Sequence, residues 1–215
     1  MPEAGKHAIA WTDETWNPIV GCSVVSPGCT NCYAMAQAGR LLDGNEKTPH
    51  YAGTTQASKA GPVWSGKVAR APERILTQPL RWKKPRMIFV NSMGDLFHER
   101  VPDEWIDQVF AVMALCPQHV FQVLTKRPER MREYIDKRSE DDFCEVTSAA
   151  AQIDWDATLK SPSFEVTAAN EDRFEGWLVR WPLPNVWLGV SVEDQDRADQ
   201  RVPVLLETQA VVRFV

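Results

Sequence analysis

Four short apolar runs, rich in β-branched and aromatic residues, predict buried strands. They are Met87–Asn91, Phe121–Thr125, Val186–Ser191 and Val211–Val215. None of the runs alternates strictly between apolar and polar residues, so each is expected to lie inside a sheet that is covered rather than on an exposed face.

Helical patterns separate these runs. Asp103–Leu115 follows a proline, which favours a helix start, and carries an apolar stripe. Pro128–Lys137 begins in the same way, and Glu193–Arg201 is a polar helical stretch. The resulting order β-α-β-α-β-α-β predicts an α/β fold with a parallel sheet, either covered by helices on both faces or closed into a barrel.

The length of 215 residues fits one domain, spanning 1–215. Two segments, at about 44–79 and 139–185, fit the repeat poorly and are interpreted as insertions. With Ala8–Val20 as a first strand, about five strands are accounted for, whereas a full (β/α)8 barrel needs about 250 residues. We therefore expect a partial TIM-type barrel that is incomplete at its C-terminal end.

Composition changes this picture in two ways. No apolar run is long enough to span a membrane and no signal peptide is visible, so a cytoplasmic protein is expected. The net charge of −5 argues against a generic nucleic-acid coat. Residues 139–175 carry ten acidic and two basic side chains, which leaves +3 on the rest. Nucleic acid thus remains a weakly supported partner, for which the basic stretch Arg81–Arg86 with Trp82 is the candidate contact. The commoner explanation of this stretch is a charged lead-in to a buried strand.

Three of the five cysteines, Cys22, Cys29 and Cys32, fall within eleven residues and suggest a metal centre. The turn sequence Ser26-Pro27-Gly28 can fold the first gap back on itself. Three thiolates select zinc, copper(I) or an iron–sulfur cluster. A structural zinc site needs a fourth protein ligand, whereas a cluster held by three cysteines leaves one iron open.

The other two cysteines do not fit this set. Cys116 ends an amphipathic helix and Cys144 is isolated, so both are interpreted as buried or incidental thiols. His50 and His98 remain candidate fourth ligands for zinc. The three-cysteine loop lies between the first strand and a helical pattern at Tyr33–Leu42, so it should share an edge with the other strand-end loops.

Several stretches together resemble the phage Gp37/Gp68, or three-Cys-motif, family of undefined function, which is regarded as radical-SAM-like. The stretches are Trp11–Pro18, Gly21-Cys22, Pro27–Ala34, Arg81–Arg86, Phe89–His98, Val123–Pro128 and Asn185–Glu193. The resemblance covers most of the chain outside the two insertions.

The resemblance implies a [4Fe–4S] cluster bound by Cys22, Cys29 and Cys32, with S-adenosylmethionine on the open iron. It further implies four cofactor-binding residues, Gly94 and Asp95 at the methionine amino group and Ser191 and Glu193 at the ribose. The cysteine spacing departs from the common radical SAM motif, which has three residues rather than six in its first gap and an aromatic residue where this chain has Asn31.

Three more residues are candidates for catalysis. His98 is a candidate general acid or base, or else a histidine whose hydrogen bonds are satisfied within the fold. Lys126 with Arg127, directly after a strand, can hold a phosphate or carboxylate, or can simply be solvated. Asp95 has a second interpretation as the N-cap of a following helix.

Two functions follow as hypotheses. The first is a phage-associated, radical-SAM-like iron–sulfur enzyme that uses S-adenosylmethionine on an unidentified substrate, with a nearby-encoded protein as a candidate partner. The second is a zinc-stabilised module that binds nucleic acid or protein without catalysis.

Overall fold

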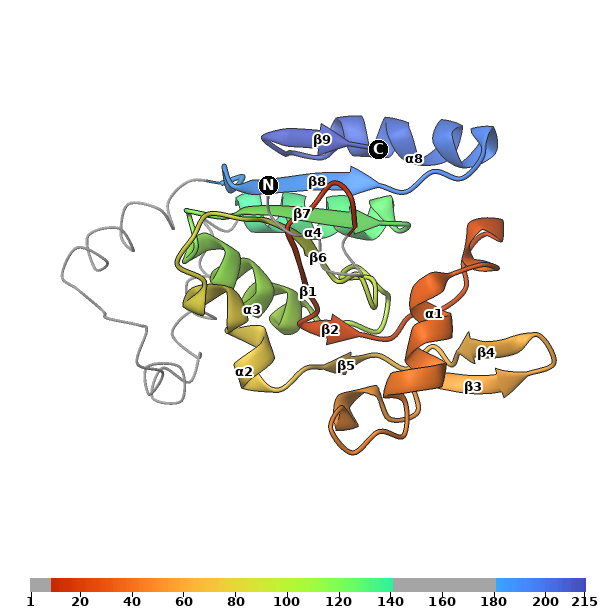
Figure 1. The fold of residues 1–215 in the computed structure, drawn as a ribbon. Helices are drawn as coiled ribbons and strands as arrows, with labels where there is room; N and C mark the ends of the chain where they lie inside the picture. Colours follow the sequence, from red (N-terminus) through yellow and green to blue (C-terminus); the bar gives the residue numbers. More distant parts are fainter. Residues whose placement is uncertain (1–8, 141–180) are drawn as a thin grey trace.

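The computed structural model describes residues 9–140 and 181–215, and a five-stranded parallel sheet forms its centre (Figure 1). In spatial order the strands are β1 (Glu14–Trp16), β6 (Met87–Val90), β7 (Val120–Thr125), β8 (Val186–Val190) and β9 (Val212–Phe214). Every neighbouring pair is parallel. All five strands therefore end at the same edge of the sheet.

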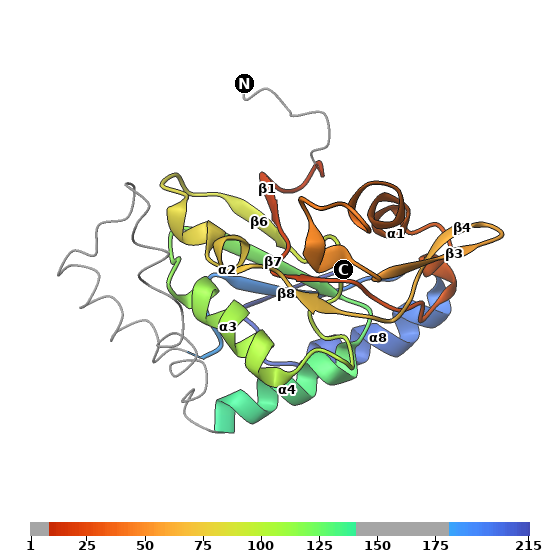
Figure 2. The ribbon, with the colours of Figure 1, turned by 90° about the horizontal axis from the view of Figure 1, so that it is seen from below.

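Three helices connect successive strands of this sheet: α3 (Asp103–Ala114), α4 (Pro128–Glu140) and α8 (Gln195–Glu207). Each connection moves the chain one strand further in the same direction. Because such crossovers are right-handed, the three helices must lie on the same face of the sheet, as Figure 2 shows.

The main hydrophobic core fills the space between this sheet face and the helices. Its strand residues include Trp16, Ile88, Val90, Phe121, Val123, Leu188 and Val190, and its helix residues include Ile106, Val109, Phe110, Met113 and Ile135. On the other sheet face, Trp11 packs edge-on against Phe89 with ring centroids 4.8 Å apart.

A buried ion pair joins two of the helices. Arg138 on α4 donates from Nε and Nη2 to the two carboxylate oxygens of Asp107 on α3, both at 2.8 Å. The Tyr134 hydroxyl donates to the same carboxylate at 2.8 Å. This bidentate contact fixes how α3 and α4 pack.

A smaller region lies beside the edge where the strands end (Figure 1). It contains an antiparallel pair of β2 (Ile19–Val20) with β5 (Ala69–Arg70) and a hairpin of β3 (Thr55–Ser58) with β4 (Gly61–Trp64). Its helical segments are η1 (Pro27–Cys29), α1 (Tyr33–Gln37), η2 (Ala38–Leu42) and η3 (Pro49–Tyr51), whereas α2 (Glu73–Leu76) and η4 (Gln78–Arg81) pack on the main core through Leu76 and Leu80. A second hydrophobic core joins the elements of the smaller region around Val20, Met35, Tyr51, Trp64 and Met93.

The α/β class and the parallel sheet are confirmed, and the four predicted strands and three helices are found with shifted ends. The helix expected at Glu193–Arg201 begins two residues later and continues to Glu207. A single first strand over Ala8–Val20 is wrong, because Asn17-Pro18 separates β1 from β2. Among the described residues the sheet is open, with β1 and β9 as its edges, so a closed barrel is not seen.

The structure describes the two predicted insertions to different extents. Segment 44–79 contains β3, β4, β5, α2 and part of η4, and is thus a folded part of the domain. Most of segment 139–185 lies outside the described residues. Over the parts of the chain that the structure describes, no helix is both long and apolar enough to cross a membrane.

Candidate functional site

Polar side chains from four loops meet at the edge where the parallel strands end. The loops follow β2, β6, β7 and β8, and two of them touch through their backbones, since Gly21 N donates to Met93 O at 3.1 Å and Gly21 pairs with Gly94. A Cβ on Gly94 would lie 3.0 Å from two backbone oxygens of the β2 segment. Gly94 therefore permits the close approach that brings the cysteine loop to the sheet.

Arg127 links three of these loops. Its guanidinium donates to Glu99 Oε1 at 2.8 Å, to Asp95 Oδ2 at 2.9 Å and to Ser23 Oγ at 2.9 Å. Its Nη1 also lies 3.7 Å from the sulfur of Cys22. Burial opposes the charge, but the two carboxylates raise the pKa of Arg127 above its usual value, so it remains a cation.

The Asp95 carboxylate is occupied by donors from the chain itself. Oδ1 accepts from the Thr125 hydroxyl at 2.7 Å and from Phe97 N at 3.0 Å. Oδ2 accepts from Lys126 N at 3.2 Å as well as from Arg127. These contacts make Asp95 an organiser of the strand-end loops. Its interpretation as a helix N-cap is wrong, because the residues after it form turns and α3 starts only at 103.

His98 is buried beneath the cysteine loop and holds Ser23. Its Nδ1 accepts from Arg100 N at 3.1 Å, which places the proton on Nε2, and Nε2 then donates to Ser23 Oγ at 2.9 Å. Burial and the charge of Arg127 lower the pKa of His98, so the ring is neutral at pH 7. In this tautomer His98 cannot take a proton from Ser23, which argues against a serine–histidine hydrolase.

A second polar cluster surrounds Glu193 at the end of β8. Lys126 Nζ donates to Ser191 Oγ and to Glu193 Oε2, both at 2.9 Å, and Arg201 donates to the same Oε2 at 2.9 Å. Burial would raise the pKa of Glu193, but the hydrogen bonds from Ser26 and Lys126 and the two cations hold it at about 2. Glu193 is thus a carboxylate across the physiological range.

Glu193 also supports the cysteine loop. A Cβ on Gly28 would lie only 2.8–2.9 Å from three side-chain carbons of Glu193, so the loop backbone rests directly on this side chain. The second oxygen of Glu193, Oε1, is buried and has no hydrogen-bond partner of good geometry among the described residues. Glu193 Oε1 is therefore a buried acceptor beside the loop.

The three loop cysteines are free thiols in different surroundings. Cys29 is buried, with its sulfur 3.8 Å from Ser26 Oγ, whereas Cys22 and Cys32 are half-buried. Burial and the charge of Asp95 raise the pKa of Cys22 to about 12, although Arg127 acts in the opposite direction. Cys22 is therefore a thiol at pH 7.

Of the two cysteines outside the loop, the structure describes one. Cys116 is completely buried in the main core, as expected, and burial raises its pKa. Cys144 lies outside the described residues. In the described parts of the chain, no three His, Cys, Asp or Glu side chains are grouped so that they could hold a metal ion, and this includes His50 and His98.

The three loop thiols were expected to bind one of two metal centres, a single zinc ion or an iron–sulfur cluster. Around one zinc ion, with Zn–S near 2.3 Å, tetrahedral thiolates lie ~3.8 Å apart, and the described residues contain no such grouping. A four-iron cube places each thiolate on a different iron, so its ligands are spread more widely. The donors that this loop offers to either centre are the three free thiols of Cys22, Cys29 and Cys32.

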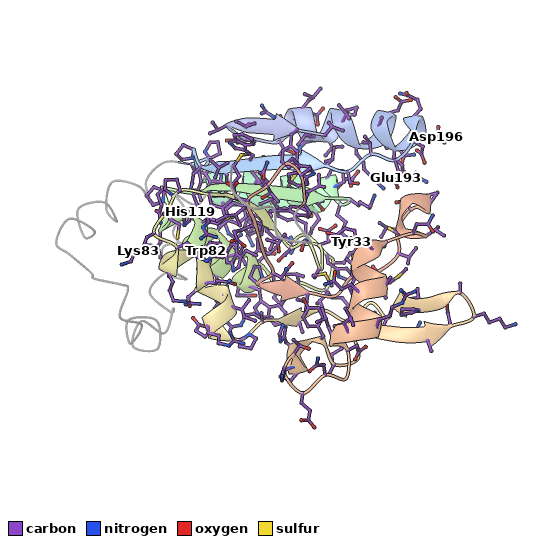
Figure 3. All side chains as sticks on the ribbon, in the orientation of Figure 1. Tyr33, Trp82, Lys83, His119, Glu193 and Asp196 are labelled. Carbon is purple, nitrogen blue, oxygen red and sulfur yellow. The ribbon has the colours of Figure 1, made fainter. Side chains whose placement is uncertain are left out.

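The predicted site residues come together in two groups: Cys22, Asp95, His98 and Arg127 in one, and Lys126, Ser191 and Glu193 in the other. Figure 3 places Tyr33 and Glu193 at this edge and Trp82, Lys83 and His119 at the far end of the sheet. The basic stretch Arg81–Arg86 is therefore remote from the site. Its Arg86 pairs with Glu14 and lies over the Trp82 ring, which supports a packing role.

Sequence reasoning missed several residues of the site: Ser23, Glu99, Tyr33 as a loop contact, and Arg201. Ser23 and Tyr33 adjoin cysteines, and this adjacency was the available signal. Arg201 lies eight residues after Glu193, within α8, and nothing in the sequence alone marks its burial.

Comparison with known proteins places the chain in a family. No curated protein and no solved structure matches it. Residues 6–215, which include every residue of the two polar groups, match the profile of the family described as "Protein of unknown function (DUF5131)". With nearly its whole length matched, the chain belongs to the DUF5131 family.

Proposed function

We propose that this protein is a radical-SAM-like enzyme whose loop cysteines bind a [4Fe–4S] cluster and whose strand-end residues position S-adenosylmethionine. The observation that carries the proposal is the placement of the three-cysteine loop. It lies at the carboxyl edge of a parallel sheet and is held there by polar residues from three further strand-end loops.

Such a site suits a cluster cofactor better than a detached zinc module. Parallel α/β sheets place ligands and chemistry at this edge. Cys22, Cys29 and Cys32 would hold three irons, and the bound cluster would supply the electron that cleaves the sulfonium of S-adenosylmethionine to a carbon radical. The chain's own part is to bind, orient and shield these groups.

The residues around Glu193 support a cofactor-binding role. Ser191 uses its oxygen to accept from Lys126, which leaves its O–H free to donate. Glu193 Oε1 is a buried acceptor that lacks a hydrogen bond of good geometry within the part of the chain that the structure describes. Ser191 and Glu193 share Lys126 as a donor, so a hydroxyl and a carboxylate lie close together, and this pair of groups suits the vicinal hydroxyls of a ribose.

Asp95 and Arg127 support the proposal in another way. Both are buried, and their hydrogen-bonding atoms are directed to chain partners. In the proposed enzyme they keep the loop after β2 in place. Lys126 is more exposed than Arg127 and has one N–H beyond its two described contacts, so it is the better candidate for touching a ligand.

The test is anaerobic reconstitution with iron and sulfide, followed by incubation of the reduced protein with S-adenosylmethionine. We expect about four irons per chain, broad visible absorption, and 5′-deoxyadenosine as a product. Cys29→Ser should lose both the iron and the product, whereas Cys116→Ala, which changes a thiol in the main core, should keep them. Colourless protein with one zinc would support the zinc-stabilised binding module instead.

A further inference from the structure

The guanidinium of Arg127 is used almost entirely for contacts with the loops of the site. Only 6% of its side chain is exposed, and it is the second residue after β7. One guanidinium nitrogen is used for Glu99, one for Asp95 and Cys22, and one for Ser23. Little of the side chain is left for a substrate to contact.

The two carboxylates hold the guanidinium in a fixed orientation. Asp95 is itself fixed by Thr125 and by two backbone N–H groups, so it cannot follow a moving arginine. Glu99 binds Nε from the other side. A guanidinium held at two nitrogens presents its remaining N–H groups in a set direction, which here is toward Ser23 and Cys22.

Ser23 strengthens this arrangement. Its hydroxyl oxygen accepts from Arg127 Nη2 and from His98 Nε2, both at 2.9 Å. Two buried donors thus fix the residue that directly follows Cys22. Through this neighbour and through its own contact at 3.7 Å, Arg127 determines where the sulfur of Cys22 lies.

We propose that Arg127 is a positioning residue that fixes Cys22 and, through its N–H near the sulfur and its charge, raises the reduction potential of a cluster bound there. The inference rests on the proposed function. A cation and a hydrogen bond to a ligating sulfur both favour the reduced cluster, because reduction adds negative charge. The sequence predicted that Arg127 binds a ligand. In this proposal Arg127 acts instead through Cys22.

The variants are chosen to separate charge, hydrogen bonding and folding. Arg127→Met removes the charge and every donor, whereas Arg127→Lys keeps the charge but cannot contact Ser23 and Cys22 together. Arg130→Met is the matched control, since Arg130 lies three residues further along the chain, on α4, and pairs with Asp103 rather than with the cysteine loop.

The measurement is an anaerobic redox titration of the reconstituted protein, followed by the electron paramagnetic resonance signal of the reduced cluster. At a fixed solution potential, we expect the ratio of reduced to oxidised cluster to fall about tenfold in Arg127→Met, equivalent to 59 mV for one electron. Arg127→Lys should show a smaller fall, and Arg130→Met none. A merely structural arginine would change the melting temperature without changing this ratio.

Each outcome decides the proposal. Folded Arg127→Met that keeps the wild-type ratio of reduced to oxidised cluster would overturn it, whereas folded protein that loses the cluster, while Arg130→Met retains it, would support it. If Arg127→Met does not fold, the ratio in Arg127→Lys decides, and a wild-type ratio overturns the proposal. Wild-type protein without any cluster would overturn the proposed function itself, and the role of Arg127 with it.

Discussion

Replacing Gly28 by alanine should disrupt the contact between the cysteine loop and the sheet. The added Cβ would lie 2.8–2.9 Å from Cβ, Cγ and Cδ of Glu193, whereas carbon atoms normally approach to about 3.5–4.0 Å. One of the two groups must move by more than half an ångström. Glu193 cannot move freely, because Lys126 and Arg201 both bind its Oε2.

The expected cost follows from this geometry. Overpacking of a well-packed site costs about 1–3 kcal/mol, and moving Glu193 would in addition weaken two charge-assisted hydrogen bonds. We therefore expect Gly28→Ala to lower the free energy of unfolding by ~2 kcal/mol. For a chain of this size the melting temperature should fall by roughly 4–8 °C.

Urea denaturation of four proteins tests the reasoning: the wild type, Gly28→Ala, Glu193→Gly and the double variant. Removing the Glu193 side chain removes all three close contacts, so Gly28→Ala should cost less than ~0.5 kcal/mol in that background. An equal cost in both backgrounds would show that the loop does not rest on Glu193, and the described site would be wrong.

Other changes test the remaining parts of the account. Arg138→Met should lower the free energy of unfolding by about 3–5 kcal/mol, because it leaves the Asp107 carboxylate buried without its ion pair; urea denaturation measures this, and a loss below 1 kcal/mol would contradict it. His98 has a pKa below that of an unfolded histidine, so the unfolded chain binds more protons below about pH 6.5 and stability should fall with acidification. This fall should be smaller in His98→Gln, and an unchanged pH profile of stability would refute the buried neutral ring. Cys22, with a pKa near 12, must lose its proton to bind iron, so cluster assembly should be faster at pH 8.5 than at pH 7; the growth of visible absorption measures this, and a rate independent of pH would count against Cys22 as a ligand.

Much of the fold could be predicted because the spacing of hydrophobic residues differs between strands and helices. The apolar runs of β6, β7 and β8 and the apolar stripe of α3 are each typical of one structure, and the structure confirms them. The division of the first strand was not predicted, although Asn17 and the proline after it interrupt the segment, because the rest of the segment looks continuous. There the antiparallel pairing of β2 with β5 decides the path, and such a long-range contact leaves no local pattern.

The candidate site was predictable to a similar extent. The rule that chemistry collects at the carboxyl ends of parallel strands brought Cys22, Asp95 and Glu193 to one edge. The roles of individual residues were harder to predict, because they depend on pairing across loops. Arg201 resembles a surface residue in the sequence, yet it is buried against Glu193. Asp95 looked available for a ligand, yet its oxygens are taken by groups of the chain.

The most direct test of the central claim is the electron paramagnetic resonance spectrum of the reduced, reconstituted protein before and after addition of S-adenosylmethionine. The account predicts a signal from a [4Fe–4S] cluster whose g-values change when the cofactor is added, because three cysteines leave one iron open to it. A cluster signal that S-adenosylmethionine leaves unchanged, or protein that binds zinc and gives no signal, would contradict the account.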